Sequence, residues 1–304
     1  GEGTAKKSGG RLCPGTAVIH KLVAQWAGEA SIKQLCLALG VSRSGYYAAR
    51  ARQAQPKALC HDSLHIKAAF AASGNTYGSR RLQAALCAQG LVIGRYRCRS
   101  LMQAHGLHAQ WRRKFAHTTD SKHALAVADN VLDRQFTVQQ ANQVWVCDIT
   151  YIRTANGWLY LAAVLDLYSR RIVGWAMAAS MPAALVCKAL QMAITSRYPA
   201  PGLLLHSDRG SQYASDEHRK LLDKHGLVAS MSRKGNCWDN AVMERFFLNL
   251  KMERVWQHRY ANHSEAMRDV ADYIVNFYNR ERLHSSLGYR SPEQFENQGM
   301  RAGL

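Results

Sequence analysis

The chain has 304 residues and a mass of 34.0 kDa, which is enough for two domains with a small helical module beside them. Hydrophobic residues make up 47% of it, which excludes a disordered or low-complexity protein, because such chains lack the apolar surface to form a core. Forty Lys and Arg against 21 Asp and Glu give a net charge of +19, so the expected partner is a polyanion such as a nucleic acid.

The positive charge is concentrated in the N-terminal half. Residues 1–143 hold 20 basic and 6 acidic residues, a net +14, whereas residues 144–304 hold 20 and 15, a net +5. A ribosomal or histone-like protein is the alternative, but seven Trp and thirteen Tyr argue against it. We expect the first half to bind nucleic acid and the second half to keep carboxylates for chemistry.

Several classes of protein are excluded by what the sequence lacks. Eight cysteines occur with no C-x-x-C pair, so we expect reduced thiols rather than a zinc ribbon or a redox motif. The longest apolar runs, 158–165 and 182–194, are too short to span a membrane, and no secretion signal stands near the start.

Residues 1–28 are expected to be a flexible leader. Gly1–Gly10 consist of small and charged residues, and the first methionine is Met102. We therefore expect this leader to come from an upstream reading frame or an expression vector rather than from a natural start.

Residues 29–56 are predicted to form a segment that resembles a helix-turn-helix. Apolar side chains recur at helical spacing from Ile32 to Leu39, a glycine follows, and Ser42 can cap a second short helix. The side chains expected to face DNA are those of Arg43, Ser44 and Tyr46. An ordinary pair of helices without a DNA contact is the alternative.

Residues 57–115 are predicted to form a second helical DNA-binding module, in which a turn near Gly90–Gly94 separates two helices. Arginines stand on both sides of this turn and suit phosphate contacts, although a solvated basic face is the alternative. They are Arg80, Arg81, Arg95, Arg97 and Arg99. Residues 116–143 have little periodicity and are predicted to be a linker.

From Val144 the apolar spacing changes to a period of two, which is typical of strands. We predict strands over 144–152, 158–169, 170–178, 203–208 and 227–232, and helices over 182–196, 215–226 and 237–256. Three strands followed by alternating helices and strands indicate a mixed α/β fold with a five-stranded sheet flanked by helices. This domain is predicted to span 144–256, and a helical extension to span 257–304.

Three acidic residues stand where this domain can bring them together. Asp148 lies in the first strand, Asp208 ends the fourth, and Glu244 lies in the long last helix. Converging carboxylates need a cation to stay ionised, and hard oxygen ligands favour Mg²⁺ or Mn²⁺. Such a set predicts two-ion phosphoryl transfer. Spacing alone is weak support among 21 acidic residues, but Gly210 permits a tight turn after Asp208.

The long helix carries polar side chains on the face that bears Glu244. Asn240, Glu244 and Lys251 follow at intervals of four and seven residues, so they share that face. We predict that Asn240 and Lys251 contact the DNA backbone beside the cations, with a solvated face as the alternative. For Glu244 the alternative is a surface glutamate that pairs with a basic neighbour.

Four segments in order carry a resemblance to a known family: WVCDITYI, HSDRGSQY, GNCWDNAVMERFF and YNRERLHSSLGYRSPEQF. They resemble the OrfB-type catalytic transposases of bacterial copy-out, paste-in insertion sequences, in the retroviral integrase (DDE) superfamily. The resemblance covers roughly residues 31–295, because TYGSRRL and GVSRSGYY match the family's N-terminal helical region.

This resemblance implies an RNase H-like core whose D,D(35)E set is Asp148, Asp208 and Glu244, with two Mg²⁺ ions per site and Mn²⁺ as a substitute. Lys251 occupies the position of the family's basic residue seven after the glutamate. The implied partners are double-stranded DNA at the element's terminal inverted repeats and at the target, further copies of the chain on DNA, and a protein from the upstream frame. The implied location is the bacterial cytoplasm, at the nucleoid.

The activity we expect is hydrolysis of a phosphodiester at the element's ends, followed by strand transfer by the freed 3′-hydroxyl. A structure-selective nuclease of the same superfamily, which cuts without joining, is one alternative. A DNA-binding regulator without catalysis, which uses only the helical modules, is the other.

Overall fold

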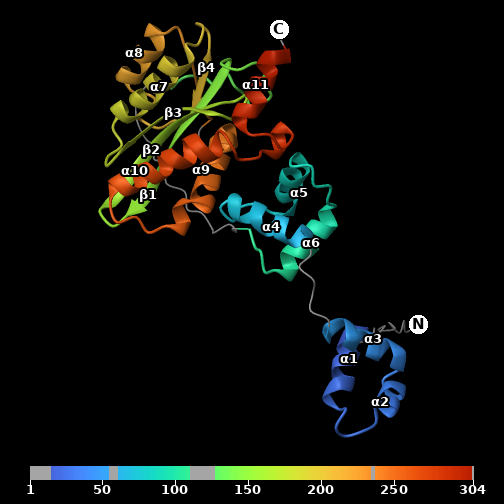
Figure 1. The fold of residues 1–304 in the computed structure, drawn as a ribbon. Coiled ribbons are helices and arrows are strands. Elements are labelled where there is room, and N and C mark those ends of the chain that lie inside the picture. The colour runs from blue at the N-terminus through green and yellow to red at the C-terminus, as the bar shows by residue number, and fades with distance from the viewer. Residues whose placement is uncertain (1–14, 55–60, 110–126, 234–236, 303–304) are drawn as a thin grey trace, which may run out of the picture. The chain divides into compact units, whose positions relative to one another are not determined.

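The computed structural model describes residues 15–54, 61–109, 127–233 and 237–302. The chain divides into two compact units, Gly1–His61 and Asp62–Leu304, and Figure 1 shows the elements of each. Within the described residues, none of the helices is both long enough and apolar enough to cross a membrane.

The described residues of the first unit form three helices: α1 (Thr16–Gln25), α2 (Ile32–Ala38) and α3 (Arg43–Ala54). The Ser31 hydroxyl caps α2 by accepting from the backbone of Gln34, and the Ser42 hydroxyl accepts from the Gly45 N–H at 3.0 Å. Both predicted helices of the 29–56 segment are therefore confirmed, with Ser42 at the start of the second.

Helix α1 lies inside residues 1–28, so the prediction of a flexible leader is wrong for Thr16–Gln25. Val23 is completely buried against Cys36 and Tyr46, which form the small core of this unit. Helical spacing also brings apolar side chains of α1 onto one face. Residues 1–14 lie outside the described part of the chain.

The second helical module contains α4 (His61–Ala72), α5 (Ser79–Ala88) and α6 (Arg95–Ala104). Its core includes Ile66 from α4, Leu82 from α5 and Cys98 from α6, all completely buried. The predicted helix, turn and helix are confirmed by α5 and α6.

A five-stranded sheet follows, with the strand order β3-β2-β1-β4-β5. The strands are β1 (Val144–Thr154), β2 (Gly157–Asp166), β3 (Ile172–Ala178), β4 (Leu204–Ser207) and β5 (Val228–Met231). The first three are antiparallel neighbours, whereas β4 and β5 run parallel to β1. This mixed sheet, with helices on both faces, is the predicted RNase H-like fold.

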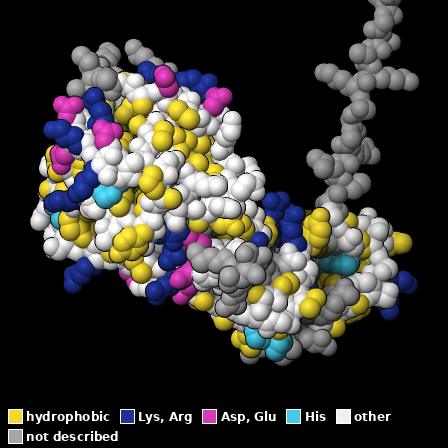
Figure 2. Space-filling model, turned by 90° about the horizontal axis from the view of Figure 1, so that it is seen from above, with side chains coloured by type: hydrophobic (Ala, Val, Ile, Leu, Met, Phe, Trp, Pro, Cys, Tyr) yellow, Lys and Arg dark blue, Asp and Glu magenta, His cyan; other side chains and the backbone are white. Residues whose placement is uncertain are grey.

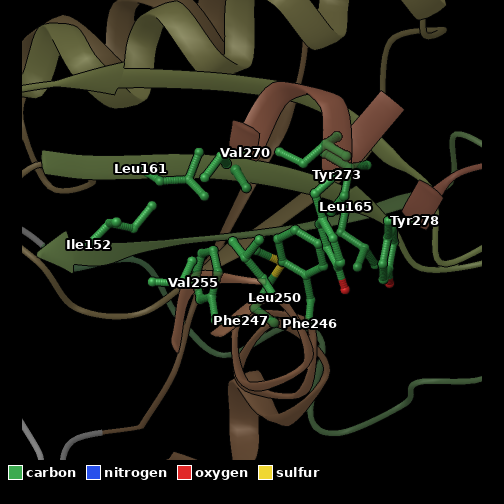
Figure 3. Packing of buried hydrophobic residues seen from close by; sticks show 14 of the residues in the cluster. Ile152, Leu161, Leu165, Phe246, Phe247, Leu250, Val255, Val270, Tyr273 and Tyr278 are labelled. Carbon is green, nitrogen blue, oxygen red and sulfur yellow. The ribbon is translucent and has the colours of Figure 1, made fainter. Parts of the chain in front are cut away.

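Two apolar cores enclose the sheet. One face is covered by the helices α7 (Ala183–Arg197) and α8 (Asp216–Lys224). The other face is covered by α9 (Ala241–Glu253), α10 (His263–Asp272) and the π-helical turn η3 (Tyr273–Tyr278) (Figures 1 and 3). Because β-strands direct alternate side chains to opposite faces, Trp145 packs into the first core and Val146 into the second. A Cβ on Gly174 would lie 2.3 Å from the Ala189 carbonyl oxygen, so only glycine permits the contact of β3 with α7.

The segments on either side of residues 144–256 contribute to the same core. Leu132 is buried in this core, although residues 116–143 were predicted to be a linker. Val270 and Tyr273, from the predicted helical extension, are buried in the same core. The remaining described elements are the short helices η1 (Cys237–Asn240), η2 (Val255–Gln257) and η4 (Ser285–Leu287) and the helix α11 (Pro292–Ala302). The domain limits at 143 and 256 therefore do not mark breaks in the packing.

A buried ion cluster joins the second helical module to the sheet domain. Arg282 is 1% exposed and donates to both Glu253 carboxylate oxygens at 2.7 Å. The Tyr273 hydroxyl donates to Glu253 at 2.7 Å, and Arg81 of α5 approaches it at 3.5 Å. Beside them the Tyr77 hydroxyl accepts from the Leu283 N–H at 2.8 Å. Residues from opposite ends of the unit's sequence are thus held together.

We predict that Glu253→Gln lowers the free energy of unfolding by about 3–5 kcal/mol, because it leaves the buried Arg282 guanidinium without a counter-charge. Burial opposes ionisation of Glu253, but the attraction of Arg282 and the hydrogen bonds from Arg282 and Tyr273 outweigh it and hold the pKa of this carboxyl below its usual value. Denaturant unfolding with Glu281→Gln, an exposed neighbour, as the control measures the effect.

The same lowered pKa sets the pH dependence. A carboxylate with a depressed folded pKa stabilises the protein above its unfolded pKa of about 4.3 and loses this effect as the pH falls through the folded pKa. The difference between parent and Glu253→Gln should therefore be constant from about pH 7 to about pH 5 and shrink under more acidic conditions. A difference that grows on acidification would contradict the assignment.

Candidate active site

The register of the parallel pair β1–β4 brings two carboxylates together. Val146 lies beside His206 in this pair, and two residues further along each chain stand Asp148 and Asp208. Strand β4 ends at Ser207, and neighbouring strands lie about 4.8 Å apart, so both side chains meet where β4 leaves the sheet. Both residues are half-buried.

Backbone groups orient the two carboxylates. The Ile149 N–H donates to Asp148 Oδ1 at 2.7 Å, and the Gly210 N–H donates to Asp208 Oδ1 at 2.9 Å. A Cβ on Gly210 would lie 3.0 Å from that Asp208 oxygen. Gly210 is therefore suited to this turn because it lets the backbone approach the carboxylate closely.

Helix α9 supplies the third carboxylate. Met243, Phe246, Phe247 and Leu250 are buried against the sheet at helical spacing, and the last three are labelled in Figure 3. This packing fixes the rotation of α9 and leaves Glu244 exposed, one turn after Asn240. Val242, which directly precedes Met243, is half-buried.

The charges of the three acidic residues act on one another. Burial raises the pKa of the Asp148 carboxyl well above its usual value, and the charges of Asp208 and Glu244 raise it further. The hydrogen bond from Ile149 and the charge of Lys251 oppose this rise. A cation bound beside Asp148 would relieve this repulsion.

The donor set fits a hard divalent cation. Within the described residues, no three His, Cys, Asp or Glu side chains stand close enough to form a complete metal cage. Mg²⁺ commonly binds through one or two carboxylates and keeps the rest of its shell for water and substrate phosphates. The adjacent pair Asp148 and Asp208 meets that requirement, and Glu244 lies within electrostatic reach.

Two residues predicted to contact the DNA backbone have other partners. Asn240 is 4% exposed, and its Nδ2 donates to the Cys147 carbonyl oxygen at 3.2 Å, which fastens the start of α9 to β1. Lys251 is 5% exposed, with its Nζ 4.5 Å from the centre of the Tyr151 ring. The packing of α9 turns both toward β1, and their DNA contacts stay a prediction.

The environment of Lys251 suits a positioning role. Burial lowers the pKa of its ammonium group to about 8, and the negative charge of Asp148 partly opposes this. Its partner Tyr151 was not predicted as a site residue, although it lies in the same motif three positions after Asp148. A strand pattern shows that Tyr151 alternates with its neighbours, but it does not show which helix residue covers it.

Two further residues near the site are structural. The Asp239 carboxylate is completely buried and accepts from Arg134 at 2.8 Å and from Arg233 at 3.1 Å. His206 is buried between Ser230 and Ser232, at 2.9 and 3.2 Å. Burial lowers the pKa of its imidazole to about 4, so His206 is a neutral packing residue.

The predicted DNA contacts of the helical modules divide into exposed and buried residues. The exposed ones are Arg43, Ser44, Arg80, Arg95, Arg97 and Arg99. Tyr46 is 3% exposed inside the core of its unit, and Arg81 is paired with Glu253, so these two are less accessible to DNA than the others. On the face of the molecule shown in Figure 2, basic side chains are interspersed with acidic ones.

Comparison with known families gives three matches. Residues 138–237 and residues 225–292 each match a model described as an integrase core domain, and residues 61–115 match an HTH-like domain. The second core match extends past residue 256, in agreement with the packing of α10 and η3 on the sheet.

Two relatives are similar over nearly their whole length. An uncharacterized 31 kDa protein of insertion element IS600 from Shigella sonnei is 44% identical over 263 residues, which cover 86% of this chain and 97% of that protein. The transposase InsF for insertion sequence IS3A of Escherichia coli K12 is 41% identical over 276 residues, covering 90% and 96%. Among solved structures, the HTLV-2 integrase catalytic core domain in complex with magnesium matches with a TM-score of 0.41 and 14% identity, over 52% of this chain and 97% of that one.

We predict that Mn²⁺ raises the melting temperature of the parent protein, because an ion bound only to the folded state stabilises it by mass action. Asp208→Asn should reduce this rise, since it removes one of two adjacent carboxylates. Thermal unfolding across a Mn²⁺ titration measures the effect, with Asp223→Asn on the exposed side of α8 as the matched control. An equal rise in Asp208→Asn and in the control would exclude Asp208 as a ligand.

Proposed function

The chain belongs to the family of insertion-sequence transposases that includes InsF of IS3, and from this we propose that it cuts a phosphodiester at each end of its element and joins the freed 3′-hydroxyl to target DNA. The observation that supports this activity most is the pairing of Asp148 with Asp208 across β1 and β4, with Glu244 presented from α9. Metal-assisted transfer between phosphodiesters uses this kind of acidic, oxygen-rich site.

In this proposal Asp148, Asp208 and Glu244 hold Mg²⁺, with Mn²⁺ as a substitute and two ions per site. When bound, the cations would lower the pKa of the attacking hydroxyl group and stabilise charge on the leaving oxygen. Asp148 and Asp208 are oriented by the Ile149 and Gly210 N–H groups, so they need little rearrangement to bind. Lys251 limits the negative charge of the unliganded site.

The two reactions follow the same course. A water oxygen attacks the phosphorus at the element's end, the bond from phosphorus to the 3′-oxygen breaks, and a 3′-hydroxyl and a 5′-phosphate result. That 3′-hydroxyl then attacks a phosphodiester of the target, and the target's own 3′-oxygen leaves. In each step one phosphorus–oxygen bond forms as another breaks, and neither step requires a Ser or Tyr nucleophile from the protein.

The helical parts of the chain provide the DNA-binding surface in this proposal. The HTH-like module and the first unit carry exposed arginines, in the half of the chain that has a net charge of +14. Terminal inverted repeats and target DNA are the proposed ligands, and further copies of the chain and an upstream-frame protein are the proposed partners. The proposed place of action is the bacterial cytoplasm, at the nucleoid.

The proposal is tested by incubating the full chain with labelled element ends and Mg²⁺ and separating the products by size. Strand-transfer products, longer than the substrate, are expected. Cut ends without joined products would instead identify a structure-selective nuclease. Binding without either product would identify a DNA-binding regulator.

We predict that Glu244→Gln abolishes both cutting and joining while DNA affinity is kept or increased, because the change removes a negative charge near the bound phosphates. Glutamine nearly preserves the volume, and Glu244 is exposed, so the fold should be unaffected. Product formation and DNA binding are measured in parallel, with Glu217→Gln on α8 as the control. Joining at close to the parent rate would mean that Glu244 is not part of the site.

We predict that changing Arg95, Arg97 and Arg99 together to Ala reduces the dependence of DNA affinity on salt. For each arginine that binds a phosphate in the parent, its removal should lower the slope of log affinity against log salt by about 0.9. The reduction should be the same for specific and random DNA, since phosphate contacts carry no sequence information. Arg43→Ala should instead reduce the discrimination between the two. A triple variant with the parent slope would show that α6 does not face DNA.

A further inference from the structure

A cavity of about 500 Å³ lies beside α9, apart from the three carboxylates. We call it the arginine cavity, because Arg81, Arg170, Arg245 and Arg282 all line it. They come from α5, from the turn between β2 and β3, from α9, and from the segment before η4. Four parts of the chain that are distant in sequence thus direct guanidinium groups to one space.

The cavity has an excess of positive charge. Among the described residues that line it, Glu253 carries the one carboxylate, and Arg282 engages both of its oxygens at 2.7 Å. His284 also lines the cavity, and burial, followed by the charges of Arg282, Arg81 and Arg170, lowers the pKa of its imidazole to about 2. His284 is therefore neutral and accepts from Arg282 Nη1 at 3.2 Å. Four guanidinium groups against one carboxylate leave a local excess of positive charge.

Arg170 has an unmet hydrogen-bonding requirement there. Its Nη2 donates to the Phe136 carbonyl oxygen at 3.2 Å, whereas its Nη1 is buried and has no hydrogen-bond partner among the described residues. The backbone of Arg170 is held at φ 61° by the turn, where its N–H donates to the Asp166 carbonyl oxygen at 2.8 Å. A buried donor without a partner destabilises the fold, and a small shift of the Arg170 side chain would let an anion in the cavity satisfy it.

Arg245 connects the cavity with the face of α9 that carries the third carboxylate. It directly follows Glu244, so the two side chains are about 100° apart around the helix. Arg245 is exposed, whereas Arg170 is half-buried at the other wall. Arg245 and Arg170 therefore stand at an exposed and at a half-buried part of the cavity lining.

We infer that the arginine cavity binds one backbone phosphate of the DNA strand on which the chain acts, through Arg170 and Arg245. Guanidinium groups suit this ligand, because they offer paired N–H donors that match phosphate oxygens and stay charged when partly buried. The cavity's volume lies in the range of sites that enclose a small ligand, and so accommodates a phosphate with its sugar. This inference rests on the proposed function and adds a second point of attachment for DNA.

The test measures the affinity of the full chain for a labelled duplex of random sequence over a range of salt, without divalent ions so that no cutting occurs. Arg245→Gln and Arg170→Gln should each lower the salt slope by about 0.9 relative to the parent. Arg268→Gln, an exposed arginine of α10 that does not line the cavity, is the matched control and should keep the parent slope. Melting curves verify that each variant is folded, and Arg245→Gln preserves the test if Arg170→Gln is not.

A second measurement locates the contact. Single phosphates of the duplex are replaced in turn by neutral methylphosphonates, and at one position the parent should lose affinity while Arg245→Gln loses no more. Equal slopes for Arg245→Gln, Arg268→Gln and the parent would overturn the inference. A second result would also overturn it: inorganic phosphate raises the melting temperature of the parent but not of Arg170→Gln, and the salt slopes of DNA affinity are the same in all variants. The cavity would then bind a free anion rather than DNA.

The outcome is separable from that of the proposed function. A lowered slope in the cavity variants, together with a parent chain that fails to join DNA ends, would support the cavity and refute the transposase activity. If the parent joins DNA ends but the cavity variants keep the parent's salt slope, the transposase activity would be supported and the cavity's role in DNA binding refuted.

Discussion

Three backbone pairs between β1 and β4, from Val144–Leu204 to Val146–His206, determine the arrangement of the proposed active site. The parallel pairing sets Asp148 and Asp208 side by side, and the early end of β4 opens the space in front of them. A shift of one residue in this register would send one of the two side chains to the opposite face of the sheet. The buried residues on both faces, from Trp145 on one side and Val146 on the other, prevent that shift.

The site combines groups that destabilise one another. Burial and neighbouring acidic charges act against ionisation of Asp148, while burial acts against protonation of Lys251. Such arrangements persist at functional sites because the surrounding packing supplies the stability that they lack. Here the support comes from the apolar side of α9 and from the Asn240 bond to β1, which hold the charged groups without taking part in the chemistry.

The strands and the long helix could be predicted from the sequence because their apolar periods are strong, and the order of motifs indicated which acidic residues to propose for the site. The direction of individual polar side chains could not be predicted. Arg80 and Arg81 are adjacent on α5, yet the first is exposed and the second pairs with Glu253, because a step of one residue turns the side chain by about 100°. Tyr46 and Lys251 are buried by partners from other elements, which no local pattern reveals.

The bonds of Tyr77 to the backbone of Glu281 and Leu283 have a consequence for the order of events during synthesis. The helices α4 to α6 leave the ribosome long before their partners in the C-terminal segment are made. At bacterial rates of roughly 5–20 residues per second, the wait is on the order of 10–40 s. During that time the module has its own core but lacks its anchorage, so a nascent or prematurely terminated chain presents basic helices without the attached catalytic domain. Completion of the chain is therefore the event that anchors the helical module to the catalytic domain.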